Sequence, residues 1–213
     1  MVLTVLDFAA TLVFALTGAL TASRKEMDVV GHMWLAVATG VGGGTLRDLL
    51  LGAPVFWMDR PGIIGLCLAV AIVTHFTAHL LESRYRYILW FDAFGMGFVA
   101  IAGAAKGLNY EVGALIAVVM GVFTASAGGI IRDVLGQEPS IVLRREIYVT
   151  AAALGAGVYV TARLWGLEPT LAAGIGITLA VGARLVALAT GWSMPVYRPR
   201  PGRTEEELEE LDL

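Results

Sequence analysis

Seven long apolar runs constrain the fold of this chain more than any other feature of its sequence. A bilayer core of about 30 Å needs about 20 apolar residues of helix to cross it, and each run has close to that length. Charged residues mark most of the gaps between the runs. The runs cover residues 2–23, 29–53, 62–81, 87–105, 112–136, 146–165 and 170–191. We therefore predict an all-α membrane protein with seven transmembrane helices.

Composition supports a membrane protein over a soluble domain. Hydrophobic residues make up 57% of the chain, whereas soluble domains are about 45–50% apolar. The runs are continuous and do not alternate, which argues against a β-barrel, and backbone groups in lipid must be paired within the segment. The basic residues form no helix face, so no nucleic-acid partner is expected. Cys67 is the only cysteine and is interpreted as a buried, inert thiol.

The distribution of basic residues predicts the orientation in the membrane. Ten Arg and Lys residues fall on the side of the C-terminus and four on the opposite side. This excess places the C-terminus in the cytoplasm and the N-terminus outside. The first run starts at Met1 without a basic leader and is interpreted as a retained helix. Residues 193–213, rich in proline and then in acid, are expected to form a flexible cytoplasmic tail, with a short acidic helix after Thr204 as the alternative.

The chain matches itself when it is shifted by 85 residues. From position 7 to position 60 this shift gives 14 identities without a gap. The identities include charges, glycines and prolines, which chance matches in apolar sequence rarely supply. They include Asp7 with Asp92, Gly43–Gly44 with Gly128–Gly129 and Arg47–Asp48 with Arg132–Asp133.

Three predicted helices fall in each repeat, so the second repeat enters the membrane from the opposite face. Residues 1–192 are thus predicted to form one domain of two inverted three-helix repeats, about 5–82 and about 87–165. The helix at about 170–191 lies outside the repeat. Inverted repeats of this kind are typical of transport proteins, which place the pathway where the repeats meet.

The second helix of each repeat contains a glycine cluster followed by an Arg-Asp pair. The first reads Gly42-Gly43-Gly44-Thr45-Leu46-Arg47-Asp48 and the second Ala127-Gly128-Gly129-Ile130-Ile131-Arg132-Asp133. Glycine costs up to about 1 kcal/mol relative to alanine inside a helix. These clusters therefore predict a kink or break in both helices. Carbonyl groups freed at a break could replace the water shell of a cation.

The Arg-Asp pairs have two interpretations. An arginine within a transmembrane helix costs about 2.5–3.5 kcal/mol on insertion scales, so such residues usually face a polar pathway or a partner. Arg47 could pair with Asp48 or Asp133, and Arg132 with Asp133 or Asp48. The alternatives are a structural ion pair and, for the glycines, simple tight packing. Because both features occur together and twice, we favour a pathway.

Four further residues are weaker candidates for the pathway. Asp7 and Asp92 open the first helix of each repeat and could line a vestibule or cap the helix end. Thr45 and Ser126 carry small hydroxyl groups near the glycines and could line the path or bond back to their own helix.

Nothing in the sequence indicates an enzyme or a metal centre. No pair of catalytic carboxylates and no nucleophile with a base emerges from the sequence. His75 and His79 lie one turn apart, but no third ligand is evident, so they are interpreted as interfacial histidines. No cofactor is expected.

Seven spans, two three-helix repeats and the repeated Gly-Gly-x-x-Arg-Asp motif at 43–48 and 128–133 resemble bacterial homologues of the trimeric intracellular cation (TRIC) channels. The same sequences are also grouped as a glycine-transporter-type domain. The resemblance covers about residues 5–192. It implies a homotrimer in the bacterial inner membrane, with a potassium-permeable pathway through each protomer between the second and fifth helices.

The resemblance also implies which residues line that pathway and which ligands to expect. The ligands are the permeant K⁺ or Na⁺ and, as a further candidate, membrane lipid. Animal members use lysines in voltage response and lipid binding, but the only lysines here are Lys25 and Lys106, neither near the second motif. The pathway residues it implies are Gly42, Gly43, Gly44, Arg47, Asp48, Gly128, Gly129, Arg132 and Asp133.

Three functions remain open at this point. A monovalent cation channel is favoured by the resemblance. A secondary transporter of a small solute such as glycine would also suit inverted repeats with interrupted helices. A structural or lipid-binding membrane protein without a pathway would instead have continuous, lipid-facing glycine segments.

Overall fold

The computed structural model describes residues 2–81, 83–140, 147–195 and 202. This part of the chain forms seven α-helices and one short 3-10 helix. Their bounds are α1 Val2–Arg24, α2 Val29–Leu50, α3 Gly62–Thr77, η1 Ala78–Leu80, α4 Arg84–Asn109, α5 Ala114–Leu135, α6 Val149–Leu164 and α7 Pro169–Thr190. The predicted all-α fold with seven helices is therefore confirmed. The predicted tail falls almost wholly outside the described residues.

Six of the helical segments are long and apolar enough to cross a membrane. The sixth predicted span is shorter than expected, because α6 has 16 residues and is about 24 Å long at 1.5 Å per residue. Large apolar side chains on the outer surfaces of the long helices are exposed, among them Val73, Phe123 and Leu171. Apolar groups on the outside of such helices face lipid. The chain is an integral membrane protein.

Helix α4 begins and ends beyond its predicted limits, and α2 ends earlier than predicted. The predicted fourth span ended at residue 105, whereas α4 continues to Asn109 and so includes Lys106. Helix α2 ends at Leu50 because Gly52 adopts a left-handed conformation with φ +62°, and Pro54 follows. A left-handed residue after the last turn terminates a helix.

The backbone conformation that ends α1 recurs 85 residues later at the end of α4. Glu26 after α1 and Glu111 after α4 both have φ of 54°. In each turn the next amide bonds back across the end of the helix, from Met27 to the carbonyl of Ala22 and from Val112 to the carbonyl of Gly107. This pair of bonds is typical of a left-handed helix cap. The repeat read from the sequence is thus also a repeat of backbone conformation.

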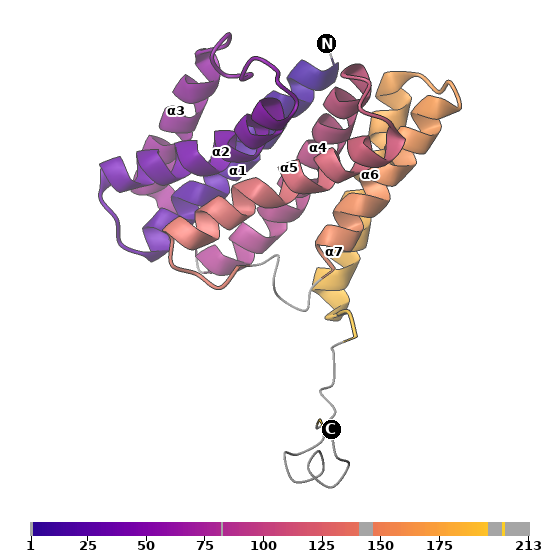
Figure 1. Ribbon diagram of the computed structural model, residues 1–213. Helices are drawn as coiled ribbons and strands as arrows, with labels where there is room; N and C mark the ends of the chain where they lie inside the picture. Colours follow the sequence, from indigo (N-terminus) through magenta and orange to yellow (C-terminus); the bar gives the residue numbers. More distant parts are fainter. Residues whose placement is uncertain (1, 82, 141–146, 196–201, 203–213) are drawn as a thin grey trace, which may run out of the picture.

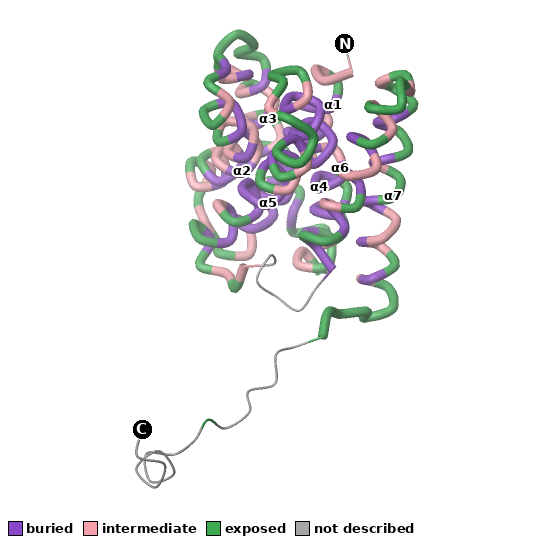
Figure 2. Tube along the Cα trace, turned by 45° about the vertical axis from the view of Figure 1, so that its right-hand side comes forward, coloured by how far each residue is buried: buried purple, intermediate pink, exposed green. Residues whose placement is uncertain are grey.

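The four helices that open the two repeats form the centre of the molecule. Helices α1, α2, α4 and α5 pack against one another, α3 packs on α1 and α2, and α6 and α7 pack on α4 and on each other. Figure 1 shows α3 at one edge and α6 and α7 at the other. Buried residues concentrate between the helices, and the outward surfaces are mostly exposed (Figure 2). Residues buried at the centre therefore come from both repeats.

The sequence predicted a kink or a break in the second and fifth helices, and the break is wrong. Helix α2 is continuous through Gly42, Gly43 and Gly44, and α5 is continuous through Gly128 and Gly129. Neither helix frees backbone carbonyls at its glycines. Gly43 and Gly128 serve instead to bring the two helices close together.

Candidate functional site

Helices α2 and α5 cross at one glycine on each. A Cβ atom on Gly43 would collide with the carbonyl oxygen of Thr124, and one on Gly128 would lie 2.9 Å from the carbonyl oxygen of Thr39. Backbone atoms cannot move aside as a flexible side chain can. Only glycine therefore allows this approach, as at other close helix crossings in membranes.

Two further glycines make room for the threonines of this crossing. A Cβ on Gly18 of α1 would lie 2.7 Å from the Thr39 hydroxyl, and one on Gly103 of α4 would lie 2.6 Å from the Thr124 hydroxyl. Each threonine hydroxyl donates to a carbonyl of its own helix, four residues earlier. The two repeats therefore meet around a pseudo-twofold axis with matched contacts on both sides.

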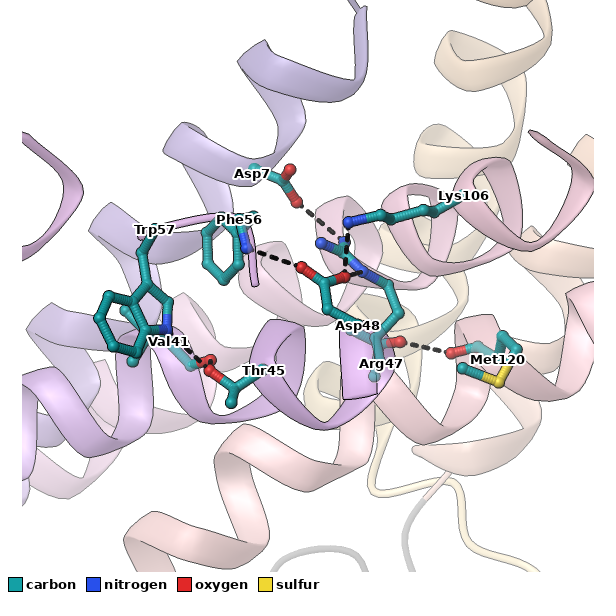
Figure 3. Close-up of polar contacts among 10 residues, drawn as sticks. Asp7, Val41, Thr45, Arg47, Asp48, Phe56, Trp57, Lys106 and Met120 are labelled. Carbon is teal, nitrogen blue, oxygen red and sulfur yellow. Dashed lines mark hydrogen bonds and ion pairs between the residues drawn. The ribbon is translucent and has the colours of Figure 1, made fainter. Parts of the chain in front are cut away.

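The first charged cluster consists of Asp7, Arg47, Asp48 and Lys106. Arg47 donates from Nη1 to Asp7 Oδ1 at 2.9 Å and from Nε to Asp48 Oδ1 at 2.7 Å. Lys106 Nζ donates to the same Asp48 oxygen at 2.7 Å. Figure 3 shows these side chains converging from α1, α2 and α4. Two cations and two anions make the first cluster neutral in formal charge.

Asp48 is the centre of the first cluster and is completely buried. Its second oxygen accepts from the backbone N–H of Phe56 at 2.8 Å, in the segment that follows α2. The guanidinium of Arg47 lies over the Phe56 ring, with its central carbon 5.5 Å from the centre of the ring. A buried carboxylate costs free energy unless it is paired and hydrogen-bonded, and Asp48 meets both conditions.

The second charged cluster consists of Thr17, Asp92, Arg132 and Asp133. Arg132 donates to Asp92 at 2.6 Å, to Asp133 at 2.9 Å and to the Thr17 hydroxyl at 3.2 Å. Arg132 and Asp92 are each 1% exposed. The other carboxylate oxygen of Asp92, Oδ2, is buried without a hydrogen-bond partner in the part of the chain that the structure describes. Arg132 with its two carboxylates has a formal charge of −1.

The two clusters lie at different depths of the same helices. Helix α1 contributes Asp7 to the first cluster and Thr17 to the second, ten positions apart, or about 15 Å along the axis. Helix α4 contributes Asp92 to the second cluster and Lys106 to the first. Between them Phe14 is 2% exposed, and its ring would lie 3.1 Å from a Cβ on Gly95. A packed apolar layer therefore separates the two charged clusters.

The structure selects among the pairings that the sequence left open. Each arginine pairs with the aspartate next to it and with the aspartate of the first helix of its own repeat. Asp7 and Asp92 are thus ion-pair partners and not helix caps. Among the ion pairs of the two clusters in the described residues, Lys106 with Asp48 joins one repeat to the other.

The remaining predicted residues lie around the crossing and bond locally. The hydroxyls of Thr45 and Ser126 donate to carbonyls of their own helices, at 2.7 and 2.9 Å. Thr45 also accepts from the Trp57 indole. A Cβ on Gly42 would meet Ile131, and one on Gly44 would meet the Phe56 ring, each at 2.5 Å. These glycines are therefore used for packing.

Two buried cations were missed by the sequence reading. Lys106 was assigned to a loop because the apolar run ended one residue before it. Arg184 lies within the apolar run of α7, is 1% exposed, and has its guanidinium carbon 5.4 Å from the centre of the Tyr148 ring. A lone basic residue inside a span of otherwise apolar residues is the signal that could have found Arg184.

Comparison with protein families gives a match to both repeats. The sequence model of the family described as "Glycine transporter" matches residues 4–79 and again residues 89–163. The two matches begin 85 residues apart, as the internal repeat requires. Together they cover more than half of the chain.

Relatives and solved structures agree over nearly the whole chain. The inner membrane protein YadS of Escherichia coli is 41% identical over 201 residues, 90% of this chain and 94% of that protein. A membrane protein of Vibrio cholerae is 39% identical over 198 residues, 90% of this chain and 81% of that protein. The TRIC trimeric intracellular cation channel orthologue of Rhodobacter sphaeroides is 48% identical, with 90% of this chain and 99% of that chain covered and a TM-score of 0.87. A prokaryotic TRIC channel solved in 0.5 M KCl is 25% identical, with 91% and 99% covered and a TM-score of 0.85. The chain therefore belongs to the family of TRIC channels, whose repeat is described as the glycine transporter type.

Proposed function

We propose that this protein is a channel for monovalent cations, potassium among them, with a pathway through each protomer between α2 and α5. The observation that carries the proposal is the pair of buried charged clusters at two depths of one helix bundle. Charged groups inside a membrane protein are rare and mark functional sites, ion pathways among them. Similar solved structures described as cation channels support the same function.

The pathway would run from one charged cluster to the other through the crossing of α2 and α5. Asp48 and Asp133 supply negative charge next to each arginine, and Asp92 Oδ2 supplies a carboxylate oxygen without a hydrogen-bond partner in the described part of the chain. The layer around Phe14, Gly43 and Gly128 is closely packed, so ions would pass only after α2 and α5 separate. The conformation described here would then be a closed one.

The arginines would act as counter-charges that hold the closed conformation. A cation entering either cluster competes with a guanidinium for the same carboxylates. Breaking the ion pair between Arg132 and Asp92, or the one between Arg47 and Asp7, would free a carboxylate for the entering cation. Lys106 adds a second cation to the first cluster, which would lower the attraction of that cluster for a permeant cation.

Three finer features belong to the same proposal. The basic residues favour a cytoplasmic C-terminus and an N-terminus outside. A homotrimer with one pathway in each protomer follows from the family, whose solved member from Rhodobacter sphaeroides is described as trimeric. The likeness to channels also supports a function without catalysis.

The second candidate is a secondary transporter of a small solute such as glycine. The description of the family model favours it, and inverted repeats with a central site suit alternating access. Coupled, saturable uptake would distinguish it from a channel, because a channel passes many ions for each opening.

The deciding experiment is single-channel recording of the purified protein in planar bilayers with asymmetric potassium and sodium. We expect unitary currents that reverse near the potential of a monovalent cation, and Arg132→Ala should alter their open probability or size. Trp57→Phe, which removes only an indole bond to Thr45 on the outer side of α2, is the matched control. Silent bilayers with folded protein, together with uptake of labelled glycine into vesicles, would contradict the channel.

A further inference from the structure

Two histidines meet between α2 and α3, away from both charged clusters. His32 lies in the first turn of α2 and is 3% exposed, and His75 lies in the last turn of α3 and is half-buried. Their Nδ1 atoms are 3.4 Å apart, and the rings meet edge to face at 4.6 Å between centroids. This contact closes one end of the interface between α2 and α3.

The hydrogen bonds determine where the proton lies. His32 Nδ1 is 3.0 Å from the carbonyl oxygen of Asp28, and a carbonyl only accepts, so this nitrogen must carry a hydrogen. His75 Nδ1 faces the same hydrogen and must therefore present its lone pair. The contact requires a neutral His75, with its own hydrogen on Nε2.

His75 is the histidine of the pair that can take up a proton. His32 Nε2 is buried and has no hydrogen-bond partner among the described residues, so a charge on His32 would be both desolvated and unpaired. His75 is closer to water. Protonation of His75 would place two N–H groups against each other and would replace an attraction by a repulsion.

The other repeat shows that the fold does not need histidines here. The positions 85 residues later are Ala117 of α5 and Val160 of α6, which are 0% and 3% exposed and belong to an apolar cluster that α1, α4 and α7 also line. The second repeat therefore has apolar residues at these positions. The histidines add a polar contact that packing alone does not demand.

Other charged or titratable groups lie at this end of the helices: His79 follows His75 by one turn, and Arg84 of α4 donates to the carbonyl of Ala78. Asp28, whose carboxylate bonds to the amide of Gly31, and His75 are the charged or titratable groups that influence His32. At the end of α1, Arg24 and Lys25 form ion pairs with Glu138. Helix α5 carries no charged residue before Arg132. No group of three metal-binding side chains lies in the described part of the chain, so the chemistry favours a proton over a metal ion.

We propose that His32 and His75 form a proton-sensitive clasp between α2 and α3, closed when His75 is neutral and opened when His75 is protonated. Acidification would therefore open the clasp, because a proton on His75 Nδ1 removes the lone pair that accepts. Because α2 also carries Gly43 and Arg47, its release at this end would loosen the helix that forms the crossing. The inference does not depend on what the protein transports.

Cys67, the only cysteine of the chain, is a natural reporter of this interface. It is 0% exposed, and its sulfur would lie 3.0 Å from a Cβ on Gly40 of α2. Gly40 and Cys67 are each eight residues from the histidine of their own helix, or about 12 Å along it. Separation of α2 from α3 would therefore expose the Cys67 thiol.

The experiment measures the labelling rate of Cys67 by 4,4′-dithiodipyridine, in full-length protein in lipid nanodiscs at pH 8 and pH 5.5. The control is His32→Ala with His75→Val, the residue types that the other repeat uses at these positions. The ratio of the two rates removes the intrinsic pH dependence of the thiol. We expect the ratio of the natural protein to the control to rise several-fold on acidification, because protonation of His75 separates α2 from α3 and exposes Cys67.

A ratio that stays constant between the two pH values would overturn the proposal. If the double variant does not fold, His75→Gln serves as the control, because it keeps a polar side chain that does not titrate. With either control, labelling that accelerates equally in both proteins would also overturn the proposal.

Discussion

The two charged clusters have the same Arg-Asp motif and different surroundings. In both, the arginine binds the aspartate beside it and the aspartate of the first helix of its repeat. Among the described residues, the first cluster adds the ammonium of Lys106 from the other repeat, and the second adds the hydroxyl of Thr17. Duplication thus preserves the ion pairs, and the neighbouring repeat determines the charge that surrounds them.

The strongest test of this comparison removes one arginine at a time. Arg132→Ala removes the counter-charge of Asp92, which is 1% exposed, and should destabilise the protein by about 3–5 kcal/mol. Arg47→Ala should cost less, because Lys106 still neutralises Asp48. Thermal unfolding in detergent measures both variants. Equal losses would mean that Lys106 does not distinguish the clusters, and Arg132→Ala combined with Asp92→Asn should recover part of the loss.

The second test concerns the crossing that the two repeats share. Gly43→Ala and Gly128→Ala each place a Cβ against a backbone carbonyl of the opposite helix, and overpacking of this kind costs about 1–3 kcal/mol. We expect similar losses for both, since the contacts are matched around the pseudo-twofold axis. The measurement is the unfolding temperature of each variant. A loss confined to one of the two would show that the crossing is not symmetric.

The third test makes the first cluster more like the second. Lys106→Met keeps much of the side-chain volume and removes the charge, so the first cluster would acquire the same formal charge of −1. If cations pass this cluster, the unitary potassium current should increase, by up to a few-fold. Lys25→Met, at an exposed contact with Glu138, is the matched control. An unchanged current in Lys106→Met would place the first cluster outside the pathway.

The smallest expected effect distinguishes two glycines at matched positions. In Gly44→Ala the new Cβ would lie 2.5 Å from the Phe56 ring, which is too close. The atoms nearest to a Cβ on Gly129 lie at 3.6 Å or beyond, which is ordinary contact. Gly129→Ala should therefore be neutral or stabilising by up to about 1 kcal/mol through helix propensity, and Gly44→Ala should destabilise slightly. Unfolding temperatures would show the difference. A clear loss for Gly129→Ala would contradict the ordinary contacts seen around it.

Apolar length and internal repetition allowed the fold to be predicted from the sequence. The seven helices lie close to the predicted ranges because each continuous apolar run must be helical in lipid. The breaks in α2 and α5 were predicted wrongly, since glycine permits a break but also permits close packing. Only the three-dimensional position of Thr39 and Thr124 decides between the two, and periodicity holds no information about that position.

The site was predictable in its residue types and less so in its partners. The motif drew attention to Arg47, Asp48, Arg132 and Asp133, which the structure buries in ion pairs, since charge inside a membrane helix needs a partner. Which aspartate each arginine binds depends on how α1 lies against α2, and the sequence left this open. Lys106 escaped notice because a lysine at the end of an apolar run resembles an ordinary boundary residue.

Helix α1 is a single rigid connection between the two clusters. Asp7 and Thr17 lie about 15 Å apart on this uninterrupted helix, and α4 joins the same clusters in the opposite direction through Lys106 and Asp92. A shift of α1 along its axis that lengthens its contact with Arg47 must also change its contact with Arg132. Access from the two faces of the membrane would then be mechanically linked, so that neither end could loosen without the other responding.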